Sequence, residues 1–203
     1  MNAVVFAANG DVVVSGGYDT SIRCFDCRSQ SADAICVASP FKDSVTSLAL
    51  AGDGGAVIVA GSVDGSVRQL DVRAGVITTD ALGAPVTVVA LSRDGGACIL
   101  AACAGPSVLR LIDAAQGTLL AEYSGHVNAS HRCGAGLNAD DAHVACGSED
   151  GRVVCWELVG GDIIGEWDAH GIGKTVCGLD WHPTEARSMA TCGTDGLVKL
   201  WTR

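Results

Sequence analysis

Short runs of apolar residues recur along the chain, separated by clusters of glycine and aspartate. Typical examples are VVVSGG at 12–17, AVIVAGS at 56–62 and AHVACGS at 142–148. Short valine-rich runs bounded by turn residues predict β-strands. Most are followed by Asp-Gly or Asp-Thr, which favours a tight hairpin because Asp and Gly tolerate a positive φ. The pattern therefore predicts an all-β protein built from hairpins.

A repeat with an average period of 44 residues organises these runs. Five segments align on a turn residue, at spacings of 45, 42, 44 and 45: Asp19, Asp64, Pro106, Asp150 and Asp195. Seven residues later comes a mostly acidic position: Asp26, Asp71, Asp113, Glu157 and Thr202. A large apolar residue precedes each of these: Phe25, Leu70, Ile112, Trp156 and Trp201. The predicted repeats are 1–38, 39–82, 83–123, 124–167 and 168–203, in a single domain.

Each repeat holds enough strand-like runs for a four-stranded sheet. One such sheet cannot bury both of its faces, so neighbouring sheets must stack on it, and radial stacking gives a β-propeller. The last repeat stops at its third strand, LVKLWTR. We therefore expect four full blades and a three-stranded fifth.

Composition agrees with an all-β chain and narrows the function. The 203 residues are 48% apolar and 4% aromatic, with 27 glycines, which is enough for a large core made of short strands. The net charge of -10, with no basic cluster, argues against direct binding of nucleic acid or an anionic membrane. The ten cysteines are scattered through apolar runs, no secretory signal precedes them, and no segment is long enough to span a membrane. We expect a reduced cytoplasmic or nuclear setting.

At specific residues the chain resembles the WD-repeat family. Gly125-His126 and Ala169-His170 stand where the family has Gly-His, and Trp156-Glu157 and Trp201-Thr202 stand where it has Trp-Asp. The resemblance implies a hydrogen-bonded chain in each blade, made of a loop His, a strand Ser or Thr, the turn Asp and the third-strand Trp.

Carried over position by position, this set is complete only in the fifth repeat, with His170, Thr191, Asp195 and Trp201. The fourth keeps His126, Asp150 and Trp156 but has Cys146 at the hydroxyl position. The first has Ser15 and Asp19 with Phe25, and the second has Asp64 with Ala60 and Leu70. In the third, Pro106 replaces the acid, so we expect this turn to diverge most.

Longer segments, among them SGGYDTSIRCFDCRS, LRLIDAAQGTLLAEYSGH and SEDGRVVCWELV, resemble the mitogen-activated protein kinase organizer subfamily of WD-repeat scaffolds. That resemblance implies protein partners from a kinase cascade and from the spliceosome. It also implies a seven-bladed ring, so we expect the chain to be an N-terminally incomplete, open part of one.

Three motifs suggest other chemistry. Gly173-Lys174-Thr175 lacks the earlier glycine of a phosphate loop, since Asp168 stands there, and a strand rather than a helix is predicted after it. Cys24-x2-Cys27 and His131-x-Cys133 have no second ligand pair, so strand cysteines are the favoured interpretation and we expect no metal. Neither His131 nor His143 has a nucleophile beside it in the pattern. We therefore expect no catalytic residues and no cofactor.

The favoured function is a non-catalytic protein–protein interaction scaffold. The candidate contact segments are the loops that enter each new repeat: Ser39 to Ser44, Leu82 to Val86, Ser124 to Ser130 and Asp168 to Lys174. The alternative is a substrate receptor of a cullin-type ubiquitin ligase, in which Arg28 and Arg73, two residues after Asp26 and Asp71, would contact the adaptor. An enzyme using the propeller channel is a further alternative, which the apolar inner strands disfavour.

Overall fold

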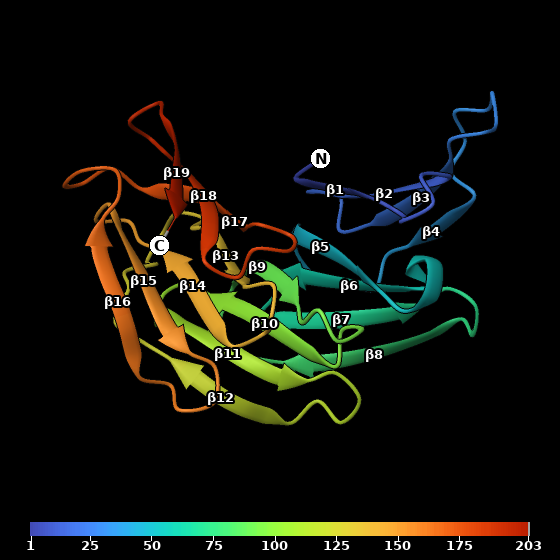
Figure 1. Cartoon of the computed structure of the whole chain (residues 1–203). Coiled ribbons are helices and arrows are strands. Elements are labelled where there is room, and N and C mark those ends of the chain that lie inside the picture. Colours follow the sequence, from blue (N-terminus) through green and yellow to red (C-terminus); the bar gives the residue numbers. More distant parts are fainter. Residues whose placement is uncertain (203) are drawn as a thin grey trace. The chain divides into compact units, whose positions relative to one another are not determined.

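The computed structural model describes residues 1–202, and it is all-β, as predicted (Figure 1). In this range the chain forms nineteen strands and one short 3-10 turn, η1 (Asp53–Gly55), with no α-helix. The strands form five antiparallel sheets in chain order, and every strand within a sheet pairs with the next.

The four complete sheets are meanders. The first holds β1 (Ala3–Phe6), β2 (Val12–Gly16), β3 (Ile22–Asp26) and β4 (Cys36–Ala38). The second holds β5 (Val45–Ala51), β6 (Val57–Ser62), β7 (Ser66–Asp71) and β8 (Val76–Ala81). The third holds β9 (Val86–Leu91), β10 (Cys98–Cys103), β11 (Val108–Asp113) and β12 (Leu119–Tyr123). The fourth holds β13 (Ala135–Leu137), β14 (His143–Gly147), β15 (Arg152–Glu157) and β16 (Ile163–Asp168).

The fifth sheet has three described strands, β17 (Val176–Trp181), β18 (Ser188–Gly193) and β19 (Val198–Thr202). Four four-stranded sheets and a three-stranded fifth are the arrangement that the repeat predicts. The chain divides into two compact units, Met1–Val89 and Ala90–Arg203, and the boundary falls within β9.

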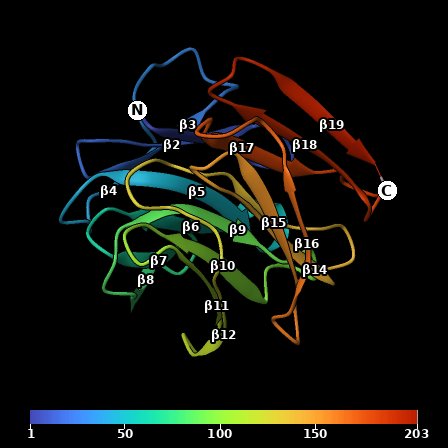
Figure 2. The same cartoon turned by 90° about the vertical axis from the view of Figure 1, so that its left-hand side faces the viewer.

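Within each unit, neighbouring sheets share a core. In the first unit, Val14 and Ile22 of the first sheet pack in one cluster with Val45 and Ile58 of the second. In the second unit, Ala145 and Val153 of the fourth sheet cluster with Val176, Trp181 and Met189 of the fifth. Figures 1 and 2 both show the fourth and fifth sheets side by side. Small residues permit this packing: a Cβ at Gly147 would lie 2.7 Å from the Cβ of Val176.

Polar groups at the start of the inner strands join successive sheets. Asn2 Nδ2 donates to Val45 O at 3.0 Å, and Thr46 Oγ1 donates to Val86 O at 2.6 Å. In the second unit the Gly134 N–H donates to Val176 O at 3.3 Å. Hydrogen bonds therefore join successive inner strands in addition to the apolar packing.

The turn between the second and third strands has one feature in all five sheets. The residue after the aligned turn position has a positive φ every time: Thr20 (60°), Gly65 (81°), Ser107 (56°), Gly151 (98°) and Gly196 (79°). A left-handed residue there costs little for glycine and more for Thr20 and Ser107. The common backbone conformation explains why the repeat favours Asp-Gly.

The third hairpin differs from the others, as expected from Pro106. Its partner for Ala102 is Leu109, three residues beyond the proline. At the matching position in the other sheets the partner lies four residues beyond the acid, as Thr191 pairs with Lys199. The Pro106 turn is therefore one residue tighter, and the cross-strand register shifts with it.

Candidate functional site

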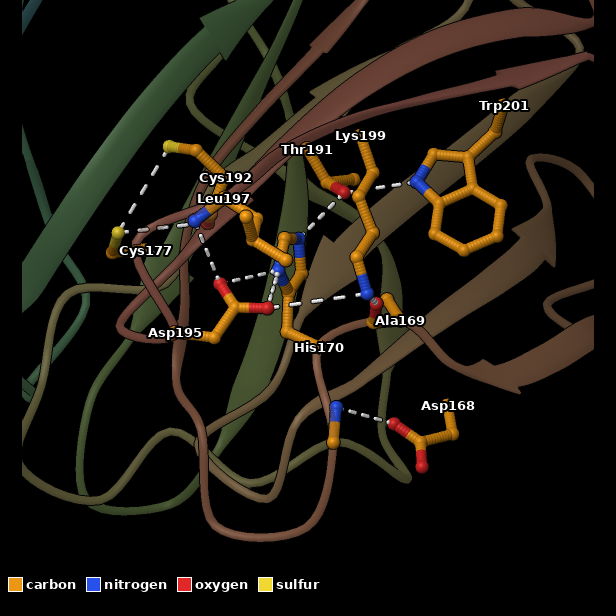
Figure 3. Close-up of polar contacts among 11 residues, drawn as sticks. Asp168, Ala169, His170, Cys177, Thr191, Cys192, Asp195, Leu197, Lys199 and Trp201 are labelled. Carbon is orange, nitrogen blue, oxygen red and sulfur yellow. Dashed lines mark hydrogen bonds and ion pairs between the residues drawn. The ribbon is translucent and has the colours of Figure 1, made fainter.

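The fifth sheet brings four predicted residues into one hydrogen-bonded chain (Figure 3). His170 lies in the loop before β17, Thr191 on β18, Asp195 in the following turn and Trp201 on β19. His170 Nδ1 is 2.9 Å from both Asp195 carboxylate oxygens, and His170 Nε2 is 2.8 Å from Thr191 Oγ1. Trp201 Nε1 donates to the same Oγ1 at 2.9 Å.

The chain of bonds can run in one direction throughout. The indole N–H donates to the Thr191 oxygen, the Thr191 hydroxyl donates to Nε2, and Nδ1–H donates to the carboxylate, which requires the Nδ1-protonated tautomer of His170. Partial burial alone would raise the pKa of Asp195, but hydrogen bonds from His170 and the Leu197 N–H outweigh it and lower that pKa. Lys199 adds to this lowering.

The fourth sheet does not form this chain, which corrects the expectation carried over to His126, Asp150 and Trp156. Both ring nitrogens of His126 are buried without a hydrogen-bond partner. Asp150 pairs instead with Arg152, whose Nε lies 2.8 Å and Nη2 2.6 Å from Oδ2. Trp156 Nε1 donates to Ser124 O at 3.0 Å.

The fourth sheet has a cysteine where the fifth has the central threonine. Cys146 occupies the place of Thr191, but its thiol contacts its neighbour's carbonyl, Gly147 O, at 3.0 Å. His126 is left beside the Trp156 ring, edge-on at 5.6 Å between centroids. Burial lowers the pKa of His126 to about 4, and the charge of Asp150 opposes this only in part. His126 of the fourth sheet is thus held by packing, whereas His170 of the fifth is held by hydrogen bonds.

The second sheet uses a buried ion pair. Asp64 Oδ2 is 2.8 Å from Arg68 Nη1, and the two side chains are only 5% and 9% exposed. The same carboxylate accepts from the Lys42 main-chain N–H at 3.0 Å, and the Arg68 guanidinium lies 4.6 Å from the centre of the Phe41 ring. Burial alone would raise the pKa of Asp64, but bonds from Lys42, Ser66 and Arg68 lower it to about 2.

In the first sheet Asp19 again pairs with an arginine, since Arg23 Nη1 lies 2.5 Å from Asp19 Oδ2 on an exposed surface. Ser15 lies on β2 opposite Arg23. The basic residues that pair with the turn acids were therefore not predicted from the sequence. A signal existed: a basic residue follows the turn acid by four positions in three repeats, as Arg23, Arg68 and Lys199.

Three of the acids that lie seven residues after a turn position, Asp26, Asp71 and Asp113, cap the following turn. Asp26 Oδ1 accepts from Arg28 N at 2.9 Å, and Asp71 Oδ1 accepts from Arg73 N at 2.9 Å. Asp113 Oδ1 accepts from Gln116 N at 2.8 Å. The Arg28 guanidinium also returns to Asp26, with Nε at 3.0 Å from Oδ1. In the structure Arg28 therefore pairs with a neighbouring aspartate of its own chain.

Two predicted contact loops of the second unit are held against hairpin turns and expose apolar side chains. In the Asp168–Lys174 segment, Gly173 N donates to Asp150 O at 3.1 Å and Ile172 is 94% exposed. In the Ser124–Ser130 segment, Ser130 N donates to Glu149 Oε1 at 2.7 Å and Val127 is 40% exposed. The backbone of each loop is held by a hydrogen bond, and an apolar side chain of the loop is exposed and can contact another protein.

Gly173-Lys174-Thr175 belongs to this loop, and β17 follows it directly, so it is not arranged as a phosphate loop. Among residues 1–202, no cluster of three or more His, Cys, Asp or Glu side chains could hold a metal ion. No helix in that range is long and apolar enough to cross a membrane.

The second unit also contains an open cavity of about 830 Å³ lined mainly by aromatic and aliphatic side chains. Trp167, Trp181 and Trp201 form much of its wall, with Glu166 and Arg187 among the polar lining residues. One cysteine and one histidine, Cys155 and His143, also line it. Because aromatic and aliphatic side chains dominate the wall, the cavity suits contact with an apolar group.

Consecutive antiparallel meanders that share cores, with an acidic turn in four of five sheets, define a protein of the β-propeller class. Sequence comparison gives the family: the WD domain, G-beta repeat, matches residues 1–26, 35–71, 117–157 and 161–202. The matched residues are more than half of the chain, which belongs to the WD-repeat family. The unmatched stretch from 72 to 116 contains the Pro106 turn.

Individual relatives support the same family assignment. WD repeat domain-containing protein 83 of Rattus norvegicus is 36% identical over 176 residues, which are 86% of this chain and 53% of the relative. The protein of the same name from Xenopus tropicalis is 40% identical with the same coverage. Pre-mRNA-processing factor 17 of Homo sapiens is 33% identical over 79 residues, 39% of this chain and 13% of that protein. The chain spans about half the length of the first two relatives.

Proposed function

We propose that this chain is a non-catalytic scaffold that binds several proteins through the loops between its sheets. The observation that carries the proposal is the pair of anchored loops in the second unit, whose backbones bond to neighbouring turns while Ile172 and Val127 stay exposed. WD-repeat proteins act as protein-interaction scaffolds, which supports the same conclusion.

The partners we propose are components of a mitogen-activated protein kinase cascade and proteins of the spliceosome. The first follows from the resemblance to the kinase organizer subfamily. The second is supported by similarity to a protein named for pre-mRNA processing. We further propose that the protein works in the cytoplasm and the nucleus, and that it needs no cofactor.

The test is quantitative affinity purification of the complete protein from cells, followed by mass spectrometry. We compare the wild type with a loop variant, Val127→Ser plus Ile172→Ser. The matched control is Leu119→Ser plus Leu120→Ser, because these side chains on the outer strand β12 are 56% and 52% exposed. Since all four positions are on the surface, neither variant should unfold the protein.

We expect kinase-cascade or spliceosomal proteins with the wild type and the control, and a loss of at least one group with the loop variant. Equal recovery from both variants would show that these loops are not the contact surface. Absence of both groups from the wild type would contradict the proposed partners.

A further inference from the structure

Cys177 and Cys192 form a close thiol pair on neighbouring strands of the fifth sheet. Their Sγ atoms are 3.9 Å apart, and Figure 3 shows the two sulfur atoms facing each other. Cys177 is exposed and Cys192 is half-buried. No disulfide joins them in the structure.

A β-bulge creates the pair. The register between β17 and β18 shifts between Val176 and Gly178, so Cys177 and Gly178 together lie opposite Cys192. A Cβ on Gly178 would lie 2.5 Å from the Cys192 sulfur, so a larger residue there would displace that thiol from its present position. The extra residue of the bulge places the Cys177 side chain next to Cys192.

The second sheet has the same bulge with different chemistry. Thr46 stands at the position of Cys177, between Val45 and Ser47, and Gly61 stands at the position of Cys192. The Thr46 hydroxyl donates to Gly61 O at 3.0 Å and to Val86 O at 2.6 Å. In the fifth sheet this hydroxyl bridge is replaced by two thiols, although a Thr and a Gly satisfy the same backbone.

We propose that Cys177 and Cys192 are a reversible oxidation site that forms an intrachain disulfide when hydrogen peroxide is present. Neighbouring residues on paired strands have Cα atoms close enough for a disulfide, and the sulfur atoms must approach from 3.9 Å to bonding distance by side-chain rotation.

The reaction balances in two steps. The exposed Cys177 thiolate attacks one peroxide oxygen and becomes a sulfenic acid, and the second oxygen leaves as water after taking up protons. The Cys192 thiol then attacks the Cys177 sulfur, the S–S bond forms, and the sulfenic oxygen leaves as a second water. The two thiols lose two electrons and two protons, and one hydrogen peroxide becomes two waters. A dithiol such as dithiothreitol reverses the change by thiol–disulfide exchange.

A second pair in the chain provides an internal comparison. Cys24 and Cys36 face each other across β3 and β4. Cys24 is 4% exposed, and burial together with Cys36 raises the pKa of its thiol to about 11. Cys36 is exposed, but its partner Cys24 is buried more deeply than Cys192 is, so this pair should form a disulfide more slowly than Cys177 and Cys192.

The experiment treats the reduced full chain with hydrogen peroxide, blocks remaining thiols by alkylation, and maps the cysteines by mass spectrometry. We expect a peptide pair joined between residues 177 and 192 with the loss of two hydrogen atoms, absent after dithiothreitol. Cys177→Ser and Cys192→Ser should each abolish the link, and Cys24→Ser should leave it intact. The oxidised wild type should melt at a higher temperature than the reduced form, because the bond restricts the unfolded chain.

Two results would overturn the proposal. One is oxidation of Cys177 to sulfinic acid in the wild type without a link to Cys192. The other is formation of the Cys24–Cys36 disulfide before any bond between 177 and 192. Both are read on the wild-type chain, so neither depends on how well a variant folds.

Discussion

Replacing Thr191 by valine removes the central hydroxyl of the fifth sheet and keeps the shape of the side chain. Thr191 is 1% exposed, and its oxygen is bonded to Trp201 Nε1 at 2.9 Å and His170 Nε2 at 2.8 Å. Valine offers neither group a partner. The variant therefore isolates the hydrogen-bonded chain from the packing around it.

The size of the effect follows from burial. The His170 side chain has no exposed surface, so its Nε2 would be left unpaired away from water, whereas Trp201 is only half-buried. An unsatisfied buried polar group costs about 1–3 kcal/mol, so with the smaller Trp201 contribution the free energy of unfolding should fall by about 2–3 kcal/mol. For a chain of this size that lowers the melting temperature by roughly 4–12 °C.

The matched control is Cys146→Val, which alters the equivalent position of the fourth sheet. The Cys146 thiol contacts only Gly147 O among the hydrogen bonds described for it, so a valine of similar size should cost less than about 1 kcal/mol. Urea denaturation followed by tryptophan fluorescence measures both variants. Combining Thr191→Val with Trp201→Phe should give a coupling energy of about 1 kcal/mol. Equal effects of Thr191→Val and Cys146→Val would refute the reasoning.

Three further predictions concern single turns. Gly151→Ala should lower the free energy of unfolding by at least about 2 kcal/mol, because φ is 98° and a Cβ would overlap Gly171 O. Gly161→Ala is the control and should cost less, because φ is 73° and the space around that residue is open. Arg68→Met should lower the free energy of unfolding, measured by urea denaturation, by about 3 kcal/mol, because the buried Asp64 carboxylate loses its ion-pair partner. Arg23→Met in the exposed pair should have little measurable effect, and equal losses would contradict this. Acidification should destabilise the protein as pH falls from about 6.5 towards 4, because His126 binds a proton in the unfolded chain but not when it is buried in the folded protein. Between pH 6.5 and 5 the free energy of unfolding should fall by about 2 kcal/mol for this reason. Melting curves recorded at several pH values should show that His126→Gln abolishes this pH-dependent loss.

The fold follows from local rules that sequence patterns record well. Apolar runs give the strands, and the aligned turn residues give the hairpins, because the residue after each turn acid must adopt a positive φ. The tighter third turn also follows, since Pro106 stands where the other repeats have an acid. These features depend on residues close together in the chain.

The hydrogen-bond partners were harder to predict because they depend on packing between segments distant in sequence. His126 and Asp150 have the right identities but share no hydrogen bond: both ring nitrogens of His126 lack a partner, and Arg152 pairs with the carboxylate. The Arg68 and Phe41 contact depends on how the loop before β5 folds over β7, which no spacing reveals. Residues close in sequence therefore determine each turn, whereas contacts between distant segments determine which residues form hydrogen bonds with it.

The central claim is that the loops bind partners while the sheets support them, and lysine footprinting tests it directly. The lysines are Lys42, Lys174 and Lys199; the first two are exposed in predicted contact loops, and Lys199 lies on β19 with its Nζ bonded to Ala169 O. An amine-reactive label is applied to the complete protein alone and in a purified partner complex. If the loops bind partners, Lys42 or Lys174 should be labelled less in the complex than in the free protein, while Lys199 should be labelled equally in both samples. Equal labelling of Lys42 and Lys174 with and without the partner would contradict it.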